Sequence, residues 1–311
     1  MYTSPLPRLS TAAITLCAFT LPMRGEDAKQ KFDWPAPALV GISEVAEKDG
    51  NHAEMSYALD VKTGDDGMFI IRITDFQFDS FNHQPITPEF ERALQPAVDA
   101  VASLPSFIVD QEGHLIDITS IDALIDETGK LLDSTGDGNT GSEAAEALKD
   151  PAMKQMLNAA ISEYWVGWVG AWVDYGLDPG ESAEEQFSEV LVPNQPAVTG
   201  TRTYQHLGET PDKPDHIHLK IDSHIGDPTM VDAIGGLISG IDKTGKAKEE
   251  INSQKMPNIT VDGGFEVKIN PTTLRPAWSR RYKNIEIKGL TEEESGTRTE
   301  SHEYTFHWKT E

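Results

Sequence analysis

Long stretches in which apolar and polar residues alternate constrain the fold of this chain most strongly. A period of two is typical of a β-strand that has one buried and one solvated face. The segment 216–225 shows it clearly, since Ile217, Leu219 and Ile221 occupy every second position. From residue 185 onward the same period predicts six strands, over 188–192, 200–208, 216–225, 259–269, 278–288 and 300–308.

Two strand pairs precede this region. Residues 55–61 and 68–78 alternate on either side of a Gly-Asp-Asp-Gly turn, which predicts a hairpin. A shorter pair, 107–109 and 115–118, is joined across Asp110-Gln-Glu-Gly113. Because short turns join antiparallel strands, we expect a mostly antiparallel sheet.

Helical periodicity dominates the middle of the chain. Apolar residues three and four positions apart predict a short helix over 121–132 and a longer one that begins at Asp150-Pro151. There Asp caps the helix and Pro takes its first position. The same spacing predicts helices over 87–103 and 230–241.

Strands at both ends and helices between them predict an α+β fold. We expect a curved, mostly antiparallel β-sheet that forms an incomplete barrel, with helices packed on one face. Residues 39–311 are predicted to form a single α+β domain with a helical insert around 119–175.

The N-terminus is typical of an export signal. Arg8 precedes an apolar run, 9–21, that is too short to anchor a chain across a bilayer. We expect residues 1–25 to be a signal peptide and 26–38 a solvated linker, so that the mature protein is periplasmic or extracellular and has no transmembrane segment. The single cysteine, Cys17, lies inside this signal, so a packed core and not disulfides must stabilise the mature chain.

The chain is strongly acidic, with 51 Asp and Glu against 26 Lys and Arg and a formal net charge of −25. This charge repels nucleic acid and anionic membranes, so neither is an expected partner. Two interpretations remain open, which are solubility and an acidic surface built for a cationic partner.

Four aromatic residues share one face of the predicted long helix, and they are Tyr164, Trp165, Trp168 and Trp172. Their large flat surfaces are suited to line a pocket for an apolar or sugar-like ligand. The alternative is a core-facing helix that closes over the sheet.

Two histidines, His216 and His218, are the candidate metal ligands. Alternate residues of a strand face the same way, so their imidazoles can converge with a carboxylate such as Asp215 or Glu266. His224 lies too far along the strand to share the same ion. The alternative is an ordinary amphipathic strand.

Other motifs point to no reaction. The segment Asp133–Glu143 resembles a calcium loop, but its last acidic residue is one position early, so a solvated Gly/Asp linker and a weak cation site both remain open. The chain has no Gly-x-Ser-x-Gly, His-Glu-x-x-His, Walker or Rossmann motif. We therefore assign no catalytic residue and no cofactor.

Several segments, taken in order, are similar to a group of uncharacterised exported bacterial proteins. They are Phe107-Ile-Val-Asp-Gln-Glu-Gly-His-Leu-Ile-Asp-Ile118, Gly200-Thr-Arg-Thr-Tyr204 and Gly264-Phe-Glu-Val267. The resemblance implies a fold similar to the lipoprotein-carrier proteins, an incomplete barrel whose concave face is covered by helices and binds acyl chains or polypeptides. It carries over no catalytic residues, and the insert around 130–170 departs from the pattern.

Three functions follow as hypotheses. The first is an exported, non-enzymatic binding protein that holds an apolar small molecule, lipid or polypeptide in a concave sheet. The second is a metal-dependent hydrolase that uses His216 and His218. The third is a structural component of the cell envelope.

Overall fold

The computed structural model describes residues 32–64, 66–92, 95, 98, 105–135, 145–189, 197–226, 258–288 and 295–308. The predicted signal peptide and the predicted helix 230–241 lie outside these ranges, as do most of the Asp133–Glu143 loop and much of the predicted helix 87–103.

In the part of the chain that the structure describes, twelve strands form one sheet in which every pair is antiparallel. They are β1 (Ala38–Lys48), β2 (Asn51–Thr63), β3 (Phe69–Phe81), β4 (Gln84–Pro85), β5 (Phe107–Val109), β6 (Leu115–Ile118), β7 (Ser182–Glu189), β8 (Val198–Thr210), β9 (Lys213–Ile225), β10 (Asn258–Ile269), β11 (Pro276–Lys288) and β12 (Gly296–His307).

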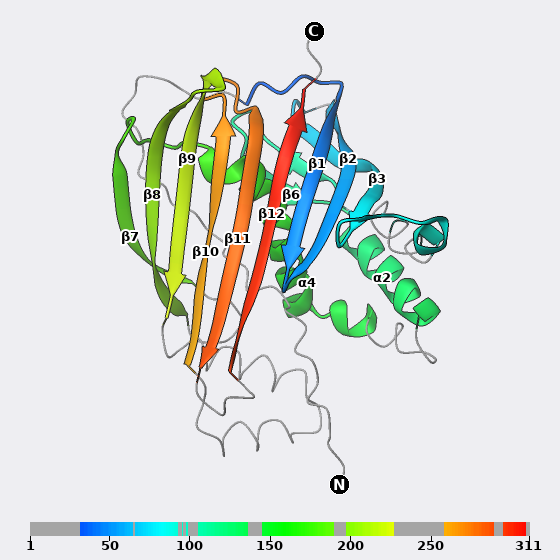
Figure 1. Ribbon diagram of the computed structural model, residues 1–311. Coiled ribbons are helices and arrows are strands. Elements are labelled where there is room, and N and C mark those ends of the chain that lie inside the picture. The colour runs from blue at the N-terminus through cyan, green and yellow to red at the C-terminus, as the bar shows by residue number, and fades with distance from the viewer. Residues whose placement is uncertain are drawn as a thin grey trace.

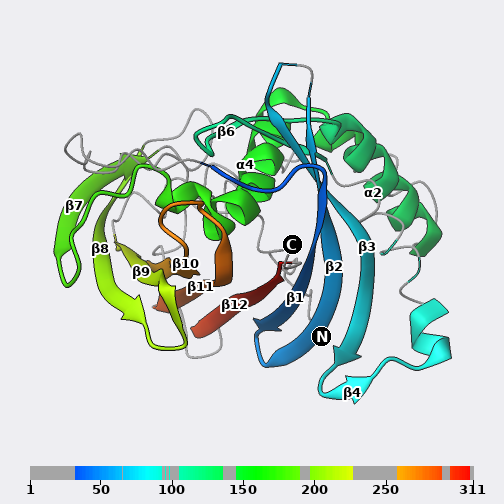
Figure 2. The ribbon, with the colours of Figure 1, turned by 90° about the horizontal axis from the view of Figure 1, so that it is seen from above.

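The sheet has the order β6-β5-β3-β2-β1-β12-β11-β10-β9-β8-β7, and β4 pairs with β3. Its centre is therefore the pairing of β1 with β12, which joins the first and the last described strands (Figure 1). Among the described residues, the two ends of this order do not pair with each other, so the sheet is open. Seen from above, it bends into an arc (Figure 2).

Helices α2 (Ile121–Thr135) and α4 (Pro151–Trp168) connect the two halves of the sheet, and a short 3-10 turn (Gly170–Trp172) follows α4. Helix α4 begins at Pro151 as predicted, and it lies within the arc (Figure 2). The α+β prediction is correct only for the open antiparallel sheet. The described chain is mostly β, because the sheet itself supplies most of the core surface.

The core lies between α4 and the concave face of the sheet. The indole of Trp168 has ring contacts with Phe107 of β5 and with Tyr304 and Phe306 of β12. Strands from both halves of the sheet therefore pack against one residue of the helix. Burial of such large apolar surfaces is the main favourable term in folding.

The end of the predicted linker also belongs to this core, contrary to the expectation of a solvated segment. Phe32 and Trp34 are buried, and both rings contact Trp165 of α4. The indole nitrogen of Trp34 donates to the carbonyl oxygen of Leu274 at 2.9 Å. Phe32 and Trp34 thus belong to the core, because their aromatic rings pack beside α4.

Most predicted strands are present, but the structure contains one strand that the pattern does not predict and one with different bounds. The pattern predicts no strand over Ala38–Lys48, yet β1 occupies the centre of the sheet. The strand predicted over 188–192 begins at Ser182 and forms edge strand β7. Charged residues on the inward rows, Glu44 in β1 and Glu185 in β7, hide the alternation in both cases.

Candidate functional site

A cavity of about 360 Å³ lies between α4 and the concave face of β10, β11 and β12. Its apolar lining comes from Ile161 on the helix and from Phe265 and Ile285 on the sheet. The ring of Tyr164 also lines it. Gly263 of β10 has no side chain to fill this space, and it lies opposite Lys283 in the strand register.

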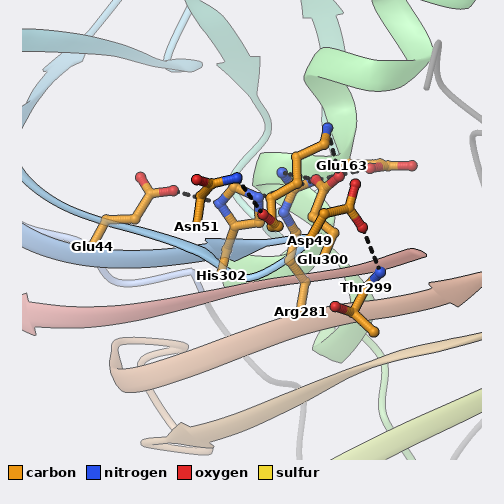
Figure 3. Close-up of polar contacts among 9 residues, drawn as sticks. Glu44, Asp49, Asn51, Glu163, Arg281, Thr299, Glu300 and His302 are labelled. Atoms are coloured by element: carbon orange, nitrogen blue, oxygen red, sulfur yellow. Dashed lines mark hydrogen bonds and ion pairs between the residues drawn. The ribbon is translucent and has the colours of Figure 1, made fainter. Parts of the chain in front are cut away.

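The charged lining comes from residues that occupy core-facing positions of β11 and β12. Arg281 lies opposite His302, and Lys283 lies opposite Glu300. Because side chains alternate along a strand, these four residues share the concave face with the buried Tyr304. Glu163 reaches them from α4 (Figure 3).

Glu163, Arg281, Glu300 and His302 form a continuous polar network (Figure 3). His302 lies between two carboxylates, with Nδ1 2.7 Å from Glu44 and Nε2 3.1 Å from Glu300. Arg281 lies 2.9 Å from Glu163 and 3.6 Å from Glu300. The network therefore links β1, β12, β11 and α4.

Two more contacts close the end of the cavity near the β1–β2 turn. The ammonium group of Lys48 lies 3.1 Å from Glu300. The carboxylate of Asp49 accepts a hydrogen bond from the backbone N–H of Thr299 at 3.0 Å. These two contacts connect the turn between β1 and β2 to the start of β12.

Burial and neighbouring charges shift the pKa values of these groups in different directions. Burial raises the pKa of Glu163 even though Arg281 and Lys283 lower it. The hydrogen bond from His302 is the main cause that holds the pKa of Glu300 well below its usual range. Burial also lowers the pKa of Lys283, because the ammonium form loses hydration.

One hydrogen-bond donor of the network is unused. The buried Nε of Arg281 has no hydrogen-bond acceptor among the residues that the structure describes. Buried donors are nearly always paired in proteins, so such a group indicates a missing acceptor.

The predicted aromatic stripe divides between core and cavity. Trp165, Trp168 and Trp172 are fully buried in the hydrophobic core, and within the described residues only Tyr164 of the four lines the cavity. The indole nitrogen of Trp165 donates to the carbonyl oxygen of Gly113, which has a φ of 102°. This hydrogen bond links α4 to the predicted Asp110–Gly113 turn. Ligand binding by the stripe stays a prediction.

The two candidate metal ligands contact different carboxylates. His216 is buried and its Nδ1 lies 2.9 Å from Asp215, whereas Nε2 of His218 lies 2.6 Å from Glu266 on β10. His224 pairs with Asp262 instead. In the part of the chain that is described, no group of three or more His, Cys, Asp or Glu residues has the geometry to hold a metal ion.

No sequence motif marks the residues of the polar network, which are Glu44, Glu163, Arg281, Glu300 and His302. Lys283, which also lines the cavity, belongs to no motif either. One signal could have found some of them, since Arg281, Lys283, Glu300 and His302 lie in predicted strands at positions of the inward row. A charge at such a position requires a partner or a function.

The fold and the cavity thus define an open, curved antiparallel sheet that carries a buried polar network beneath a helix. No protein-family model matches the chain, and no curated protein matches its sequence. The resemblance to exported bacterial proteins therefore has no support from these comparisons.

A solved structure described as "Lipid-protein interactions in lipovitellin" is similar to the chain with a TM-score of 0.37 and 9% sequence identity. The similarity covers 87% of this chain and 24% of that chain, so this chain spans only a minor part of its length. A likeness at this level carries no conclusion about function. Among the described helices, none has the length and the apolar character that crossing a bilayer requires.

Proposed function

We propose that the protein is an exported, non-enzymatic binding protein that holds an apolar ligand, or the apolar part of one, between α4 and the concave face of the sheet. The cavity of about 360 Å³ is the observation that carries this proposal. Small-molecule sites in proteins have volumes of roughly 300–1,000 Å³ and are mostly apolar with a few placed polar groups.

The lining supports this proposal. Phe265 and Ile161 are almost fully buried side chains of the core that also border the cavity. An apolar ligand placed there gains contact with surfaces that are already shielded from water. The network around Arg281 supplies the few polar groups that orient a ligand.

A hydrophobic fluorescent dye tests the proposal directly. Wild-type protein is expected to bind it saturably, and Ala160→Phe is expected to weaken binding because a phenyl ring at this cavity-lining position fills the space. Asn158→Phe places the same ring at an exposed position of α4 and serves as the control. A wild type without saturable binding, or an Ala160→Phe variant with unchanged affinity, would contradict the proposal.

Export is tested separately by N-terminal sequencing of the protein recovered from the periplasm or medium of its host. The basic and then apolar N-terminal segment supports cleavage near residue 25. Recovery of the protein with Met1 intact would contradict export. It would not affect the proposal that the cavity binds an apolar ligand.

A further inference from the structure

The cavity lining has a small excess of basic residues, whereas the whole protein has a large excess of acidic residues. The lining contains four basic residues, Lys48, Arg281, Lys283 and Arg298, and three acidic residues, Asp49, Glu163 and Glu300. The chain as a whole has a net charge of −25. The whole protein has an acidic excess, so the basic excess of the lining is a local feature of this cavity.

The acidic groups of the lining already have partners. Glu163 contacts Arg281, and Asp49 accepts a hydrogen bond from the backbone of Thr299. Glu300 has three neighbours, which are Lys48, Arg281 and His302. A cationic ligand would have to compete with these contacts, whereas the buried Nε of Arg281 has no acceptor among the described residues.

We propose that the ligand carries an anionic oxygen head group, a carboxylate or a phosphate, which lies against Arg281 and Lys283 while its apolar chain contacts Phe265 and Ile285. This inference rests on the proposed function, because it names the chemical class of the ligand of the same cavity. Guanidinium and ammonium groups form their strongest hydrogen bonds with anionic oxygens. Arg281 and Lys283 lie two positions apart on the inward row of β11, so one anionic head group can contact both.

Four probes with the same twelve-carbon chain separate head-group charge from apolar binding. They are dodecanoate, dodecyl phosphate, dodecanol and dodecyltrimethylammonium, each titrated into the full chain at pH 7 below its micelle concentration. At least one anionic probe is expected to bind about tenfold more tightly than dodecanol, since one charge-assisted hydrogen bond corresponds to this factor. The stronger of the two anions identifies the head group as carboxylate or phosphate.

Lys283→Met tests the assigned residue, because Met keeps most of the apolar stem and removes the charge. This variant is expected to lose most of the preference for the anion, measured as the ratio of the affinities for the anionic probe and for dodecanol. Lys220→Met is the matched control, since Lys220 lies on β9 with its ammonium group paired to Asp222 and does not line the cavity. It is expected to bind all four probes as the wild type does.

The outcomes distinguish this inference from the proposed function. Saturable dodecanol binding without any preference for an anion, or a preference for the cationic probe, overturns the inference and leaves the cavity as an apolar site. Failure of all four probes to bind saturably overturns both. An anion preference that Lys283→Met retains in full overturns the assigned head-group position.

Discussion

The guanidinium group of Arg281 on β11 lies 2.9 Å from the carboxylate of Glu163 on α4, although the two residues are 118 positions apart in the sequence. Both side chains are mostly buried. This contact is a direct polar link between the helix and the sheet at the cavity. It also places one carboxylate next to the guanidinium group whose Nε has no acceptor among the residues that the structure describes.

Breaking this pair on one side is expected to destabilise the fold strongly. Arg281→Met leaves Glu163 buried without its cation, and the free energy of unfolding should fall by about 3 kcal/mol. Adding Glu163→Gln removes the unpaired charge, so the double variant should recover more than about 1 kcal/mol of this loss. Urea denaturation of the two single variants and the double variant at pH 7 measures this coupling.

The neighbouring pair Arg280–Glu303 is a matched control. It has a separation of 3.5 Å and both side chains are exposed by more than a third. Arg280→Met and Glu303→Gln are expected to change stability by less than about 1 kcal/mol. Equal losses of stability for the buried and the exposed pair would show that the Arg281–Glu163 contact contributes no more than an exposed ion pair.

Glu300 predicts a particular dependence of stability on pH. The hydrogen bond from His302 lowers its pKa far below the ordinary value of 4.5, so its carboxylate stabilises the folded state at pH values above 4.5. This contribution is lost as the pH falls below 4.5 toward the folded-state pKa. Wild-type stability should therefore decrease more steeply below pH 5 than that of Glu300→Gln, as measured by urea denaturation at successive pH values.

Glu303→Gln is the comparison for this measurement, because Glu303 lies on the same strand and its side chain is 44% exposed. Its curve should run parallel to that of the wild type over the whole range. Parallel curves for wild type and Glu300→Gln would contradict the assigned hydrogen bond.

Trp168 is expected to contribute to stability as a core residue. Trp168→Ala should lower the free energy of unfolding by about 3–5 kcal/mol, because it removes transfer energy and leaves a void among Phe107, Tyr304 and Phe306. Trp278→Ala, at a half-buried position of β11, should cost less than about 2 kcal/mol. Similar losses for the two variants, measured by chemical denaturation, would mean that Trp168 does not anchor the core.

The partly buried pair His218–Glu266 distinguishes a simple hydrogen-bonded contact from a metal site. The hydrogen bond from His218 lowers the pKa of Glu266, so His218→Ala should raise that pKa toward 4.5 and lower stability by about 1–3 kcal/mol. Carboxyl NMR follows the pKa, and His224→Ala should leave it unchanged. A large loss of thermal stability that a chelator reproduces in the wild type would favour the metal hypothesis instead.

Local patterns in the sequence determine much of the sheet. The pairing of β2 with β3 and of β5 with β6 follows from alternation and turn residues, and both are confirmed. Asp110 accepts hydrogen bonds from three backbone N–H groups of its own turn, the last from His114. Pro151 starts α4 as expected. These features depend on residues close together in the chain, and that is why the sequence is sufficient to predict them.

Only the tertiary structure decides which strands meet and which charges are satisfied. Glu44 interrupts the apolar inward row of β1, and its partner His302 lies 258 positions away on β12. No local pattern specifies that pairing, because it forms only when β1 and β12, the first and the last described strands, come together. Arg281 and Glu163 cannot be predicted from the sequence for the same reason. A buried charge can be recognised as part of a site only after the fold brings its counter-charge within hydrogen-bond distance.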